Sequence, residues 1–138
     1  MNLDLKKYYE KQTDYFLDSA ESMARKGYVR SVFSFLNQSK GFAKAHSKDL
    51  LDSVKKKERT IINKAYEKGI EFKLNGVKEA IRIKGGKDDL KSILILNAYN
   101  WLNDAIDYSQ EIGKDIKRKS NKLLEQLNAL GLQEYLTT

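Results

Sequence analysis

The sequence predicts an all-α fold, an antiparallel four-helix bundle built from two tandem helical hairpins with pseudo-two-fold internal symmetry. Three observations carry this prediction. The 138 residues include no proline, the residue that breaks helix interiors. Apolar residues recur at intervals of three and four, which is the helical period. Two stretches of the chain repeat one another in order and spacing, which predicts a duplicated unit.

The repeat is clearest in a basic segment of the sequence. SVKKKERTII, residues 53–62, is matched by DIKRKSNKLL, residues 115–124, at an offset of 62. Shorter matches precede it at offsets of 61 and 57, and the offset changes mostly across glycine-marked turns. We therefore expect one helical domain over residues 1–138. Its repeats cover about 3–62 and about 63–125, and a short C-terminal tail covers 126–138.

Two apolar stripes predict the first hairpin. A helix from about residue 3 to residue 25 presents Leu5, Tyr9 and Phe16 on one face. Lys26-Gly27 should end it, because glycine freely adopts the left-handed conformation of a helix cap. The second helix should begin near Tyr28. Its apolar stripe comprises Tyr28, Val32, Phe35 and Phe42.

A break is expected near His46, with Ser47 as the N-cap of a long helix that runs toward residue 84. We expect His46 to be a packed or capping residue. Gly69 and Gly76 lie seven residues apart on the long helix and would let a neighbouring helix approach closely.

The clearest turn in the chain is predicted over residues 84–89, where Asp88 or Asp89 could cap the final helix. That helix is expected to continue through residue 116. Its inward-facing residues should be Leu90, Leu94, Trp101, Ala105, Ile112 and Ile116.

Several short motifs carry a resemblance to a known family. They are Tyr8-Tyr9, Tyr15-Phe16-Leu17, the turn KGYVRS over residues 26–31, Gly41-Phe42 and Asn103-Asp104-Ala105. With these motifs the chain resembles a small archaeal helical family, catalogued as domain of unknown function 357. The resemblance implies a helical fold and an archaeal origin, and it implies no activity.

Composition excludes several classes of function. Without cysteine there is no disulfide, thiolate metal site or cysteine nucleophile, and a single histidine excludes the usual zinc sites. No glycine loop of the phosphate-cradling type is present. We therefore expect a protein that is not an enzyme, with no catalytic residue, metal or cofactor. The chain lacks an apolar run long enough to span a membrane, and its first residues lack a secretory signal, so we expect a cytoplasmic protein.

The charge points instead to binding. Lys and Arg number 26 against 19 Asp and Glu, a net charge of +7 that favours acidic partners. The repeated basic segment predicts a surface that binds the phosphates of RNA or DNA. Its residues are Lys55, Lys56, Lys57, Arg59, Lys117, Arg118, Lys119 and Lys122. Solubility and compensation of helix dipoles at C-terminal helix ends remain an equally good interpretation of the same residues.

A second hypothesis is a protein–protein adaptor or a self-assembling subunit. A basic face is predicted from Arg30, Lys40, Lys44 and Lys48, the last three of which follow one another at intervals of four. The corresponding helix of the second copy is acidic, with Asp88, Asp89, Asp104, Asp107 and Glu111. Such faces would select an acidic protein or a second copy of the chain. Tyr28, Phe35, Phe42 and Trp101 could stack on bases, but their helical spacing favours a place in the core.

Overall fold

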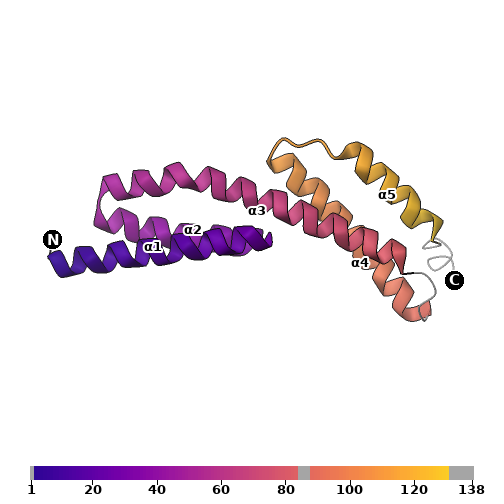
Figure 1. The fold of residues 1–138 in the computed structure, drawn as a ribbon, viewed down its shortest axis with the longest axis horizontal. Helices are drawn as coiled ribbons and strands as arrows, with labels where there is room; N and C mark the ends of the chain where they lie inside the picture. Colours follow the sequence, from indigo (N-terminus) through magenta and orange to yellow (C-terminus); the bar gives the residue numbers. More distant parts are fainter. Residues whose placement is uncertain (1, 84–87, 131–138) are drawn as a thin grey trace. The chain divides into compact units, whose positions relative to one another are not determined.

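The computed structural model describes residues 2–83 and 88–130, and within these it contains five α-helices and no strand (Figure 1). The helices are α1 (Leu3–Lys26), α2 (Val29–His46), α3 (Lys48–Arg82), α4 (Asp88–Glu111) and α5 (Lys117–Ala129). The all-α prediction is confirmed. The four-helix bundle with pseudo-two-fold symmetry is not, because the five helices fall into two compact units, Met1–Lys68 and Gly69–Thr138.

The extra helix arises from a break in the predicted final helix, whose expected continuation through residue 116 is wrong. After α4 ends, Gly113 adopts a positive φ of 64°, and Lys114 N donates to Ser109 O at 2.8 Å. Such left-handed closures favour glycine and end helices. The helix α5 then continues to Ala129, four residues beyond the predicted end of the repeat. Residues 131–138 of the predicted tail lie outside the described residues.

The other predicted helix ends are found close to their expected places. Gly27 has φ 76° and ends α1 with its N–H on Ala24 O. Ser47 separates α2 from α3, and its Oγ accepts the N–H of Leu50 at 3.2 Å, so the predicted N-cap is confirmed. The helix α4 begins at Asp88, while residues 84–87 of the predicted turn lie outside the described residues.

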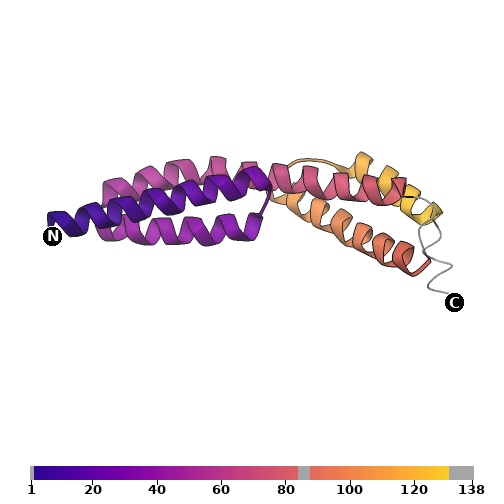
Figure 2. The ribbon, with the colours of Figure 1, turned by 60° about the horizontal axis from the view of Figure 1, so that its bottom comes forward.

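Unit 1 consists of α1, α2 and the first part of α3, which lie side by side in Figures 1 and 2. Each helix turns an apolar face inward, as the 3–4 spacing predicts, but Leu5, predicted on that face of α1, is 42% exposed and its predicted inward position is wrong. The buried apolar residues are Leu17, Ala20, Ala24, Val29, Val32, Leu36, Ala43, Val54, Ile61 and Ala65. One buried polar contact links two helices, because Ser39 Oγ donates to Thr13 O at 2.9 Å.

Aromatic residues pack beside this core rather than at its centre. Phe16 stacks on Phe42, with ring centroids 5.7 Å apart, and on Phe35 at 6.2 Å. All three rings are half-buried. Tyr28, predicted on the inward stripe, is 52% exposed, since it precedes α2 as its N-cap residue. Its predicted core position is wrong.

Unit 2 consists of the remainder of α3 with α4 and α5. One apolar cluster joins them: Ile70, Leu74, Val77 and Ala80 from α3, Ala98, Leu102 and Ala105 from α4, and Ile116, Leu123 and Leu127 from the last segment. Gly76 allows the close approach that the sequence predicts. A Cβ at Gly76 would lie only 2.7 Å from Cε3 of Trp101.

The register of the sequence repeat is visible in burial over part of the chain. Val54, Ile61 and Ala65 are buried in unit 1, and so are Ile116, Leu123 and Leu127, each 62 residues later, in unit 2. In the preceding segment the offset of 61 pairs buried Val32 with Ile93, which is 57% exposed. Burial thus follows the repeat in the third segment of each unit and departs from it between α2 and α4.

Candidate nucleic-acid interface

The first basic cluster, Lys55, Lys56, Lys57 and Arg59, lies in the interior of α3 within unit 1, with every side chain exposed. At 3.6 residues per turn, Lys56 and Arg59 lie on the side of α3 away from its buried stripe of Val54, Ile61 and Ala65, and Lys55 and Lys57 flank the stripe on its two sides. Exposed Asp52 interrupts the positive surface one turn before Lys56. The helix therefore presents a short cationic face with an acid at one end.

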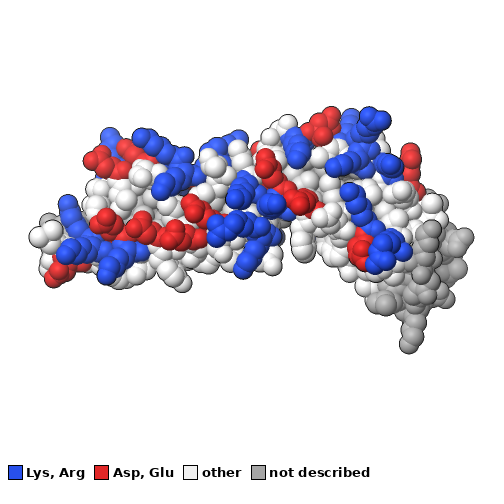
Figure 3. Space-filling view, viewed as in Figure 1, with Lys and Arg blue, Asp and Glu red and all other residues white. Residues whose placement is uncertain are grey.

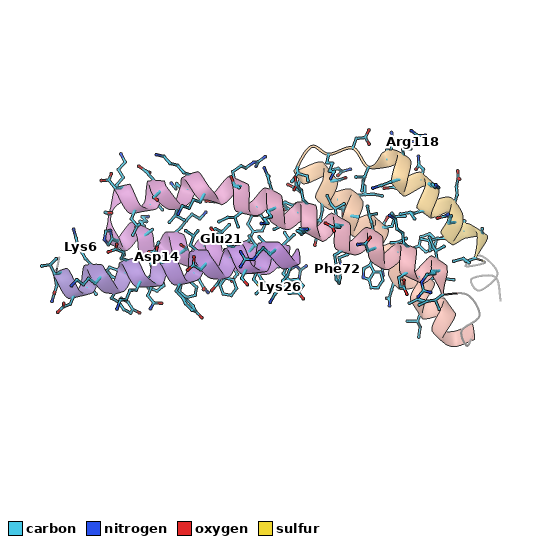
Figure 4. The ribbon with its side chains drawn as sticks, viewed as in Figure 1. Lys6, Asp14, Glu21, Lys26, Phe72 and Arg118 are labelled. Atoms are coloured by element: carbon cyan, nitrogen blue, oxygen red, sulfur yellow. The ribbon has the colours of Figure 1, made fainter. Side chains whose placement is uncertain are left out.

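The second basic cluster occupies the start of α5. Lys117, Arg118 and Lys119 form its first turn and Lys122 belongs to the next, all exposed. Figure 4 shows Arg118 pointing away from the helices of its unit. The buried residues of α5 are Ser120, Leu123 and Leu127, which fix the helix on its core and leave Arg118 and Lys122 on the opposite side. The two clusters thus belong to different units, and each is exposed within its own.

Neither cluster lies at a helix C-terminus, so the interpretation as compensation of helix dipoles is wrong. The first cluster is inside a helix, and the second lies at an N-terminus, where the dipole is positive and disfavours cations. The first turn of α5 contains no acidic residue. Asp115, just before it, accepts the N–H of Lys117 on Oδ1 at 2.9 Å. Solubility remains as the alternative role of these cations.

The predicted basic face does not form a single stripe. The helix α2 ends at His46, so Lys48 belongs to α3 and the predicted stripe of Lys40, Lys44 and Lys48 is interrupted. Lys40 is half-buried, and its Nζ lies 3.0 Å from Glu58 Oε1. Arg30 and Lys44 remain as exposed cations on α2.

The acidic helix α4 also uses part of its charge internally. Asp104 pairs with Lys73 of α3 at 3.5 Å. Asp107 and Glu111 are exposed, on the same helix as exposed Ile93 and Leu96. On the face shown in Figure 3, groups of Lys and Arg alternate with groups of Asp and Glu. Positive surface on that face is therefore local.

The remaining candidates have structural roles. Nδ1 of His46, which is half-buried at the end of α2, lies 2.8 Å from Ser47 Oγ. Trp101 is half-buried against the core of unit 2, and Phe35 and Phe42 are engaged with Phe16. Of the four aromatic candidates for base stacking, Tyr28 alone is exposed. Among the described residues, no group of three His, Cys, Asp or Glu is arranged to hold a metal ion.

Sequence reasoning missed one feature of unit 2. A cleft of about 430 Å³ lies between the end of α4, residues 112–116 and the start of α5. Lys114, Lys117, Ser120 and Asn121 contribute to its walls. The sequence signal was Gly113, which adopts a left-handed conformation in the connection between the two helices.

Within the described ranges, no helix combines the length and apolar content that crossing a bilayer requires. No family model, curated protein or solved structure matches the chain, so its likeness to the archaeal helical family stays a prediction from its motifs.

Proposed function

We propose that this chain is a non-enzymatic helical protein that binds the phosphate backbone of RNA or DNA through its exposed basic clusters. The observation that supports this most is the position of Lys117, Arg118 and Lys119. Their charges repel one another and oppose the positive end of the α5 dipole, and the turn itself holds no acid, so that Asp115 just before it offsets only part of their charge. Each such cation destabilises the free helix by roughly 0.3–1 kcal/mol at low salt. Bound phosphates would turn this repulsion into attraction.

Binding of this kind would be tolerant of sequence. Lysine ammonium groups are strongly hydrated point charges that position a backbone without reading bases. Four phosphate contacts predict a slope of about −3.6 for log K against log salt on duplex DNA, since each contact releases counterions. The same proposal explains why the basic segment is present in both units. We propose that the units arose by duplication, as the shared 62-residue register of burial in their third segments supports.

The proposal is tested by fluorescence anisotropy with labelled single- and double-stranded RNA and DNA, over about 50 to 300 mM salt. One variant carries Lys55→Glu, Lys56→Glu and Lys57→Glu, and another carries Lys117→Glu, Arg118→Glu and Lys119→Glu. Each is expected to weaken binding by roughly 10- to 100-fold at 0.1 M salt and to flatten the salt slope. Circular dichroism checks that helicity is kept.

A matched control separates these clusters from net charge. Lys6, Lys7 and Lys11 of α1 are equally exposed, and their reversal to Glu changes the net charge by the same amount. This control is expected to keep the salt slope of the unaltered chain. Equal loss in the control would contradict a role for the clusters, and absence of binding by the unaltered chain at 50 mM salt would contradict the whole proposal.

The second candidate function, self-assembly, is favoured by complementary exposed faces on α2 and α4. The first presents Arg30, Lys44 and partly exposed Phe33, while the second presents Asp107 and Glu111 with Ile93 and Leu96. Because the two faces differ, their contact would be head-to-tail. Sedimentation velocity should show concentration-dependent association that Lys44→Glu weakens. Adding Asp107→Lys to that variant should restore it, and failure of this charge swap would count against the interface.

A further inference from the structure

The cleft of unit 2 combines cationic, amide and hydroxyl groups around one helix end. Lys114 lies in the connection after α4, and Lys117 and Asn121 lie on α5. Ser120 also lines the cleft and is only 5% exposed. Its Oγ is buried and has no hydrogen-bond partner within the described part of the chain. A buried hydroxyl without a hydrogen-bond partner is destabilising. A ligand or an ordered water is therefore expected to supply the missing partner.

The neighbouring hydroxyl shows that the protein satisfies such groups where no ligand is needed. Ser109, also buried and also lining the cleft, donates its Oγ hydrogen to Ile106 O at 2.6 Å. Ser120 could in the same way have bonded to a carbonyl of the preceding turn of its helix. The difference between the two serines leaves Ser120, a residue of the cleft wall, with a buried hydroxyl that no protein acceptor occupies.

The start of α5 adds a positive field beside the cleft. The first hydrogen bond within α5 runs from Ser120 N to Ile116 O at 2.9 Å. The N–H groups of Arg118 and Lys119 precede it, so they have no acceptor inside the helix and contribute to the positive end of its dipole, although neither residue lines the cleft. Asp115 takes the N–H of Lys117. Asp115 also lines the cleft, and its negative charge would oppose an incoming anion.

We infer that this cleft binds a phosphate monoester, the group at the end of a nucleic-acid strand. A terminal phosphate has three free oxygens and close to two negative charges at neutral pH. It could therefore meet the ammonium groups of Lys114 and Lys117 and the Ser120 hydroxyl together, beside the positive end of α5. An internal phosphodiester offers two free oxygens and one charge. The inference rests on the proposed function, and it adds a preference for strand ends.

The test compares two fluorescent ten-nucleotide single-stranded DNAs that differ only in a 5′-phosphate or a 5′-hydroxyl. The phosphorylated strand is expected to bind about five- to tenfold more tightly. Ser120→Ala should abolish that preference while leaving the affinity for the 5′-hydroxyl strand within about twofold. Asp115→Asn keeps a capping oxygen but removes the opposing charge, so it should increase the preference.

Lys122→Gln is the matched control, because Lys122 lies on α5 but does not line the cleft. It should weaken both strands equally. A parallel titration with inorganic phosphate, followed by amide NMR shifts, asks whether the cleft takes the free ion. Shifts are expected at residues 117–120 in the unaltered chain and not in Ser120→Ala.

The outcomes separate this inference from the proposed function. Equal, salt-dependent binding of both strands overturns the cleft as a site for strand ends and leaves backbone binding standing. If neither strand binds while inorganic phosphate shifts residues 117–120, the proposed function fails and the cleft is a site for free phosphate monoanion or dianion. If phosphate causes no shift and the strands show no difference, the cleft holds only water and the inference is overturned.

Discussion

Replacing Leu127 by alanine is expected to destabilise the protein by about 2–5 kcal/mol, because it removes a large side chain from a packed core. Leu127 is fully buried, at 0% exposure, within the apolar cluster of unit 2. It lies on α5, a helix of 13 residues, a length at which an isolated helix is marginal in water. The packing of Leu123 and Leu127 is therefore what keeps α5 folded. The cavity left by the substitution would destabilise the whole helix.

Urea unfolding followed by circular dichroism would measure this change. Leu124→Ala is the matched control on the same helix, since Leu124 is 38% exposed and has less apolar area to lose. It should cost less than about 1 kcal/mol. A loss at Leu124 as large as that at Leu127 would contradict the assigned inward face of α5.

Gly76→Ala is expected to destabilise unit 2 although alanine is the better helix former. The exchange gains up to about 1 kcal/mol in helix propensity. The new Cβ, however, would lie 2.7 and 2.8 Å from two ring carbons of Trp101, so the ring or the helix must move. Overpacking of this kind costs typically about 1–3 kcal/mol. We expect a net loss of stability of up to about 2 kcal/mol.

The control for this exchange is Gly41→Ala on α2, where a Cβ would meet nothing within 4 Å. That variant should gain about 0.5–1 kcal/mol from propensity alone. Trp101 is the only tryptophan in the chain, so its fluorescence reports on the contact directly. A Gly76→Ala protein with unchanged emission and increased stability would show that the ring does not pack on this glycine.

The sequence predicted those helix ends that depend on local chemistry. The end at Gly27 follows from glycine's access to positive φ, and the start after Ser47 follows from its capping hydroxyl. The break at 112–116 was missed because Ile112 and Ile116 continue the apolar spacing of α4 across it. Periodicity cannot distinguish a helix that continues from one that stops and restarts in the same register, and Gly113 alone marked the difference.

Some features of the candidate site could likewise be predicted from the sequence, and others could not. That the lysine clusters are exposed follows from their composition, and the structure agrees. Their relation to the helix dipole could not be predicted, because it depends on which end of which helix they occupy. The cleft beside Ser120 depends on α4, the connection and α5 meeting in three dimensions. Residue spacing in the sequence does not reveal these tertiary contacts. From the sequence alone, a serine at this position therefore looks like any other helical residue.

The long helix α3 belongs to both compact units, since it runs from Lys48 to Arg82 and the boundary falls after Lys68. The boundary is therefore not a linker that can be cut cleanly. A fragment that stops there would leave the last four carbonyls of one new helix and the first four N–H groups of the other without intrahelical partners. Anyone who expresses one unit alone should extend it beyond this point or supply a new cap. To divide this protein into its two units, the new ends of α3 would have to be redesigned so that their backbone groups are capped.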